Sequence, residues 1–149
     1  MQTSQLRRGL AMTAAIAVLS GCAMMDNMTG TSTIRLAGTL NGAQEVPAAV
    51  TSGTGTVTAS FDKNSSKLTY EVTYSGLTGP ATAGHFHGPA AAGQNAGVVV
   101  PFANAASPIR GETTLTSAQA ADLLAGRWYA NVHTARYPGG EIRGQVMAR

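Results

Sequence analysis

The sequence has few charged and aromatic side chains and a single cysteine. Charged residues make up 11% and aromatic residues 5% of its 149 positions, and Cys22 is its only cysteine. One cysteine excludes an internal disulfide, so the fold must depend on its hydrophobic core. No Gly-x-Ser-x-Gly elbow occurs, which disfavours Ser/His/Asp hydrolysis. Histidine is also scarce, since the sequence contains only three, His85, His87 and His133.

The first 21 residues are typical of a secretory signal peptide. Arg7 and Arg8 precede an apolar run, residues 10–19, that is too short to cross a bilayer as a mature helix. The run ends in Leu-Ser-Gly-Cys22, which resembles the lipobox of bacterial lipoproteins, where the cysteine carries the lipid. The alternative is an ordinary signal peptide with a stray cysteine. We expect lipidation at Cys22, because this cysteine stands where the lipobox requires it.

This interpretation divides the chain into a signal peptide (1–21), a flexible tether (22–32) and one folded domain (33–149). A lipid at Cys22 would anchor the protein in the bacterial cell envelope, at the outer membrane facing the periplasm or the cell surface. Loss of Arg7 and Arg8 lowers the formal charge from +3 to +1, because eight basic and seven acidic residues remain. No basic cluster survives in the mature chain, so we expect no nucleic-acid partner.

The pattern from Thr33 onward is that of β-strands. In residues 55–61 and 68–74 apolar and polar side chains alternate, and turn-forming residues such as Asn41-Gly42 separate the runs. One short helix is expected over residues 117–125, since Thr116 and Gln119 form a capping-box pattern and Gly126 suits the C-terminal end. We therefore predict an all-β fold, an antiparallel β-sandwich or barrel of about eight strands with one short helix.

Two of the histidines lie in one short run, Gly84-His85-Phe86-His87-Gly88. In an extended segment alternate side chains share a face, so His85 and His87 project together while Phe86 points to the other side. Two adjacent imidazoles suit one zinc or copper ion, although a His-x-His pair on a strand is often only a solvated polar face.

His133 belongs to a second alternating run, residues 127–134. Trp128 and Val132 define its apolar side, so His133 lies on the polar side together with Tyr129 and Asn131. A core histidine satisfied by hydrogen bonds is the less natural alternative. If the two histidine-bearing strands pair, or pack near one end of the domain, the three imidazoles can converge.

Three motifs in order resemble the CHRD domain, first recognised in chordin and found in many exported bacterial proteins. They are Leu-Asn-Gly-Ala-Gln-Glu45-Val-Pro, the segment around His85 and His87, and Asn-Val-His133-Thr followed by Tyr-Pro-Gly-Gly-Glu141-Ile-Arg-Gly. The resemblance covers about residues 33–147 and implies an exported domain without an established activity. Phe86 departs from the aliphatic residue usual between the histidines, but it lies on the opposite face.

These observations favour a metal-binding domain, with copper preferred, zinc second, and His85, His87 and His133 as ligands. Glu45 or Glu141 could accept a hydrogen bond from an imidazole N–H or complete the coordination. A metal-free cell-surface interaction module and a metal-dependent oxidoreductase or hydrolase stay as alternatives. The His-x-His strand is also similar to the copper strand of copper–zinc superoxide dismutases, but three histidines are too few for that site.

Overall fold

The computed structural model describes residues 32–149. The expected signal peptide, Cys22 and almost all of the tether lie outside this range. The elements within it are β1 (Thr33–Asn41), the 3-10 turn η1 (Gly42–Gln44), β2 (Thr54–Asp62), β3 (Lys67–Ser75), β4 (Ala81–His87), β5 (Val98–Pro101), β6 (Ile109–Thr114), α1 (Ser117–Leu124), β7 (Trp128–Thr134) and β8 (Ile142–Ala148).

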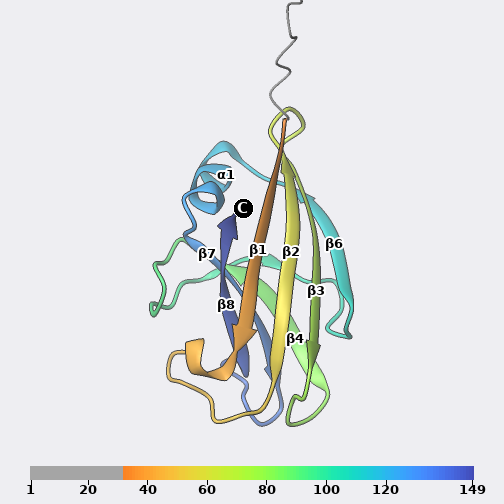
Figure 1. Ribbon diagram of the computed structural model, residues 1–149, viewed down its shortest axis with the longest axis vertical. Coiled ribbons are helices and arrows are strands. Elements are labelled where there is room, and N and C mark those ends of the chain that lie inside the picture. Colours follow the sequence, from red (N-terminus) through yellow and green to blue (C-terminus); the bar gives the residue numbers. More distant parts are fainter. Residues whose placement is uncertain (1–31) are drawn as a thin grey trace, which may run out of the picture.

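All eight strands join one antiparallel sheet, in the order β5-β4-β7-β8-β1-β2-β3-β6. The sheet curves into a nearly closed barrel (Figure 1), and β5 and β6 are the two edge strands of the sheet. The predicted all-β class, the number of strands and the single short helix are confirmed.

Alternation along the strands separates the barrel interior from its outer surface. In the β2–β3 hairpin, Val57 and Phe61 pair with Val72 and Leu68, and all four are buried. Such cross-strand pairs stabilise a sheet because their side chains pack on one face. The hairpin and its apolar face agree with the sequence prediction.

Aromatic side chains fill the part of the core beneath the histidine-bearing strand β4. Phe86 projects inward and makes edge-to-face contacts with Tyr70 and Phe102, each with ring centroids 5.0 Å apart. Trp128 of β7 packs beside the same ring, with centroids 5.9 Å apart. Phe86 therefore anchors β4 to the core through the face opposite to the histidines.

The helix α1 begins at Ser117 as its sequence predicts and ends at Leu124, one residue before the predicted end at Ala125. The Thr116 side chain accepts a hydrogen bond from the Gln119 backbone, and the Gln119 side chain accepts one from the Thr116 backbone, which completes the capping box. Gly126 follows the helix with a φ of +69°, a conformation that suits glycine at a helix end. Between residues 32 and 149, none of the helices has the length and apolar character needed to cross a bilayer.

Strand β7 is buried along its whole length, on both faces. Its inner face packs in the core, and its outer face is covered by two loops, residues 42–53 and 88–97. Hydrogen bonds hold the loops in place: Asn95 donates to the Val46 carbonyl (3.0 Å) and the Ala96 N–H donates to the Tyr129 hydroxyl (3.2 Å). The polar side of β7, which carries His133, is therefore shielded from solvent.

Candidate metal centre

The pairing of β4 with β7 brings the three histidines together. In the antiparallel register Ala83 lies opposite His133, and His85 lies opposite Asn131. His87 and His133 thus flank His85 on the same outer face of the sheet, because alternate residues of each strand share a face. The expected pairing of the two histidine-bearing strands is confirmed.

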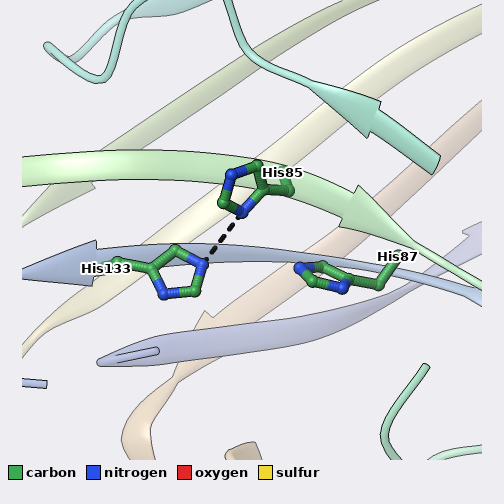
Figure 2. A group of neighbouring side chains, drawn as sticks. All are labelled: His85, His87 and His133. Atoms are coloured by element: carbon green, nitrogen blue, oxygen red, sulfur yellow. Dashed lines mark hydrogen bonds between the residues drawn. The ribbon is translucent and has the colours of Figure 1, made fainter. Parts of the chain in front are cut away.

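The imidazole nitrogens of His85, His87 and His133 converge on one small volume. One nitrogen atom from each ring lies within 4.8 Å of those of the other two. Figure 2 shows the rings directed toward one another, with Nδ1 of His85 3.0 Å from Nε2 of His133. His87 and His133 are buried, whereas His85 is partly exposed and leaves one side of the cluster open to solvent.

Backbone carbonyls orient two of the rings. Nδ1 of His87 lies 2.9 Å from the Ala96 carbonyl oxygen, and Nδ1 of His133 lies 2.9 Å from that of Pro138. A carbonyl only accepts hydrogen bonds, so each Nδ1 carries the proton and, in the neutral ring, Nε2 presents its lone pair. This arrangement of an outer N–H bond and an inner lone pair is typical of metal-ligating histidines.

Burial favours the neutral, metal-binding form of the rings. It lowers the pKa of His85 below the ordinary 6.5, and the neighbouring His133 and His87 lower the pKa further, while a hydrogen bond with Asn131 opposes this shift. Burial also lowers the pKa of His133, partly offset by its bond to Pro138. His85 and His133 can therefore bind a cation at neutral pH without first losing protons.

Asn131 lies at the centre of the cluster, although the sequence assigned it no role. Its Oδ1 is 3.0 Å from Nε2 of His87 and 3.0 Å from Nε2 of His133. The alternation of β7 already placed Asn131 on the polar side beside His133. Its contact with His87 depends on the pairing with β4, which the sequence does not show.

A stack of three side chains borders the other side of His87. The Tyr129 ring lies parallel to the His87 ring, with centroids 4.8 Å apart and planes 1° apart. The Arg143 guanidinium covers the opposite face of Tyr129, 3.4 Å from the ring centroid. It donates hydrogen bonds to the Asn95 side chain and to the Gln94 carbonyl, so the same side chain also holds the covering loop. Neither Tyr129 nor Arg143 was singled out from the sequence as a contact of the histidines.

Glu141 is buried near the end of β7, and hydroxyl groups satisfy its carboxylate. It accepts hydrogen bonds from the side chains of Thr51 (2.5 Å), Thr78 (2.7 Å) and Thr134 (2.6 Å) and from the Thr78 backbone (2.8 Å). Burial acts to raise the pKa of Glu141, but these hydrogen bonds outweigh burial and keep the pKa below its ordinary value. Glu141 thus ties the end of β7 to two loops, and its hydrogen bonds go to threonines instead of imidazoles.

Glu45 is also buried, at 6% exposure, and its Oε1 is the one buried side-chain oxygen or nitrogen atom without a hydrogen-bond partner in residues 32–149. Burial raises the pKa of Glu45 to about 7, against the attraction of Arg143 and the N–H of Val46. Oε1 of Glu45 and Nδ2 of Asn131 both border the space that a Cβ atom on Gly140 would occupy. Glu45 therefore lies close to Asn131 and makes no hydrogen bond to a histidine.

Together these features define a class of protein: an exclusively antiparallel barrel with a shielded three-histidine cluster on its outer face that could hold a metal ion. The CHRD domain model matches residues 36–146, and the chain therefore belongs to the CHRD domain family. Neither a curated protein nor a solved structure matches the chain.

Proposed function

We propose that this CHRD domain binds one metal ion through His85, His87 and His133. The observation that carries the proposal is the convergence of three imidazoles within 4.8 Å, two of them oriented by carbonyls so that their unprotonated nitrogens face inward. Without a cation, the N–H of His85 can satisfy one of these inward lone pairs, at Nε2 of His133, and Nε2 of His87 has no such donor among the three rings. With a cation, each lone pair acquires a partner.

Copper is the preferred ion and zinc the second. Imidazole ligands suit both metals, and divalent copper binds most nitrogen sites more tightly than zinc does. The donor set of three imidazoles does not suit calcium or magnesium, because these ions require several oxygen ligands.

A metal-free interaction module is less well supported. That alternative would be favoured by a large separation between His133 and His85, and these two side chains are in contact at 3.0 Å. A metal-dependent oxidoreductase or hydrolase would need an accessible coordination position and a substrate site. The partly exposed side of His85 offers access, but within residues 32–149 we find no nucleophile and base pair beside it.

The domain acts, in this proposal, at the bacterial cell envelope. The support is the signal-peptide pattern of residues 1–21 and the Leu-Ser-Gly-Cys22 motif, which would place a lipid anchor eleven residues before the start of β1 at Thr33. The metal would then be bound outside the cytoplasm, on a domain tethered to a membrane by Cys22.

Elemental analysis of the full-length protein purified from the exported fraction tests the proposal first. We expect about one copper or zinc ion per chain. Titration of metal-free protein with Cu(II), Cu(I) and Zn(II) should then show a single site that His85→Ala, His87→Ala and His133→Ala each weaken more than about 100-fold. Asn64→Ala, in an exposed turn, is the control and should bind as wild type does. Unchanged binding by His133→Ala would exclude the three-histidine site.

A further inference from the structure

Asn131 occupies the middle of the polar face that carries the histidines. On β7 it lies opposite His85 of β4 and opposite Arg143 of β8, so that it has neighbours on both sides. Its side chain is 2% exposed. A buried amide is costly unless its donors and acceptors are paired, and the partners of Asn131 therefore need to be identified.

The oxygen of Asn131 faces two nitrogen atoms that have no proton to give. Neutral His87 and His133 each have one N–H, which points to the carbonyls of Ala96 and Pro138. Their Nε2 atoms lie 3.0 Å from Oδ1 of Asn131, which is itself only an acceptor. In the metal-free domain the one ring N–H not directed to a carbonyl is that of His85, whose Nδ1 lies 3.0 Å from Nε2 of His133. The contact of Oδ1 with Nε2 of His87 then joins two lone-pair-bearing atoms, an arrangement that a bound cation would stabilise.

The opposite end of the amide explains why the oxygen faces the histidines. A Cβ atom placed on Gly140 would collide with Oε1 of Glu45 and would lie 2.8 Å from Nδ2 of Asn131, so these two atoms border the same small space. Oε1 is an acceptor without a partner, and the amide nitrogen is a donor. Reversing the amide would put two oxygen atoms at the edge of this space, so Glu45 in its ionised form favours the observed orientation.

We propose that Oδ1 of Asn131 is the fourth donor of the site and makes it selective for a divalent ion over Cu(I). The inference rests on the metal-binding function proposed above. Separations of 3.0 Å between neighbouring donors are near the ~3.3 Å edge of a tetrahedron whose ligands lie about 2.0–2.1 Å from the metal. The widest separation, 4.8 Å, exceeds twice that bond length, so loading draws the rings inward by less than about 1 Å.

Donor chemistry supplies the selectivity. An amide oxygen is a hard donor, which suits Cu(II) and Zn(II), whereas Cu(I) prefers soft ligands and is satisfied by fewer of them. Amide oxygens also serve as weak ligands in some copper sites. Asn131 would therefore contribute to the binding of divalent ions and little to that of Cu(I), and it would occupy the position that three imidazoles leave open.

Asn131→Ala tests this assignment in the full-length protein. We expect its Zn(II) and Cu(II) affinities to fall about tenfold or more while its Cu(I) affinity changes less than about threefold. Azide, added to the Cu(II) form as a probe of a free coordination position, should bind at least about tenfold more tightly to Asn131→Ala than to wild type. Asn64→Ala, the same substitution at an exposed turn, is the matched control and should leave azide binding unchanged.

A parallel loss of affinity for all three ions, or equal azide binding by wild type and Asn131→Ala, would overturn the assignment and leave the three-histidine site intact. Absence of any metal binding by wild type would overturn both proposals. If Asn131→Ala does not fold, Asn131→Asp tests whether the side chain at position 131 is a ligand. A carboxylate in the ligand position should tighten Zn(II) binding about tenfold and keep azide out, and entry of azide would contradict the assignment.

Discussion

Two backbone carbonyls determine which nitrogen the buried imidazoles present to the site. The carbonyls of Ala96 and Pro138 accept hydrogen bonds from Nδ1 of His87 and His133, and these bonds leave Nε2 free to ligate. Both carbonyls belong to the loops that follow the histidine-bearing strands. The protonation pattern of the two rings therefore depends on loop backbone as well as on the strands. Acidity is the direct test of these ring states, because protonation of Nε2 removes the lone pair.

We expect metal binding to fail on acidification, but at a lower pH than ordinary histidines would show. Burial lowers the pKa of His85 and His133 below 6.5, so the rings stay neutral until the pH falls below that value. Zn(II) affinity should change less than about threefold between about pH 7.5 and 6.5, and fall more than about tenfold near pH 5. A competition assay with a chromophoric chelator measures this, and a decline centred above pH 6.5 would contradict it.

Glu45→Gln should remove a pH-dependent contribution to stability. The folded-state pKa of about 7 lies above the ordinary 4.5, so the folded protein keeps a proton that the unfolded chain loses between these values. Glu45 therefore contributes stability that is complete below about pH 4.5 and is lost as the pH rises through 7. The glutamine of the variant is neutral at every pH. When the pH is raised from 4.5 to 8, the free energy of unfolding of the variant should therefore increase relative to that of wild type by on the order of 1 kcal/mol.

Urea unfolding of metal-free protein at the two pH values measures this difference. Glu112→Gln, at an exposed carboxylate paired with Lys67, is the control and should show little change with pH. An equal effect of Glu45→Gln at both pH values would mean that Glu45 is ionised in the folded protein throughout this range.

Among the structural elements, the connection between β7 and β8 matters most to the site. It supplies the Pro138 carbonyl that orients His133, and it contains Gly140, whose φ of +131° is rarely adopted by residues with a side chain. The connection also ends at Glu141, whose N–H donates to the Val132 carbonyl. These features lock the turn against the strand that carries His133 and Asn131.

Gly140→Ala should destabilise the domain and weaken metal binding together. The new methyl group would collide with Glu45 and press on the Asn131 amide, and the backbone would be strained as well. We expect a loss of about 1–3 kcal/mol in the free energy of unfolding and a drop in Zn(II) affinity. Gly139→Ala is the matched control, since a Cβ there meets nothing within 4 Å. Equal effects of the two substitutions would show that the space beside Glu45 is not needed.

For the molecule as a whole, we expect the fold to persist without metal. The barrel has a continuous hydrophobic core that includes the predicted core residues Phe61, Tyr70, Val72 and Trp128. The histidines lie outside that core, on the outer face of the sheet. A domain of this length buries enough apolar surface to fold alone, unlike a small zinc finger.

Chelation should therefore leave the far-ultraviolet circular dichroism nearly unchanged. Added metal should still raise the melting temperature, because binding at 100 times the dissociation constant stabilises the folded state by about 2.7 kcal/mol. His87→Ala supplies the control, since its melting temperature should not respond to metal. Collapse of the β-sheet signal in chelator would make the metal a structural component.

Cys22→Ser should release the protein from the membrane fraction. Once residues 1–21 are removed, the tether offers no other apolar anchor, and the acyl chains on Cys22 would be the only attachment. Fractionation of cells that produce wild type or Cys22→Ser, followed by immunoblotting, measures the distribution. Sedimentation of the variant with membranes would show that Cys22 does not anchor the chain.

The sequence predicted more of the fold than of the site. Alternation in residues 55–61 and 68–74 was enough to predict the β2–β3 hairpin, and the pair Thr116 and Gln119 was enough to predict the start of α1, because both patterns are local. It also placed His85, His87 and His133 on polar strand faces. The contacts of Glu141 with threonines, and of Arg143 with Tyr129, could not be predicted, because they join segments far apart in the chain.

Local chemistry decided the strands, the turns, the helix and the spacing of the histidines, since each depends on a few neighbouring residues. Tertiary structure decided which nitrogens meet. Only the register of β4 against β7 places His133 within 3.0 Å of His85, and only the packing of residues 42–53 and 88–97 over β7 buries the polar face. A shift of that register by one residue would turn His133 away from the cluster, because side chains alternate between the two faces of a sheet.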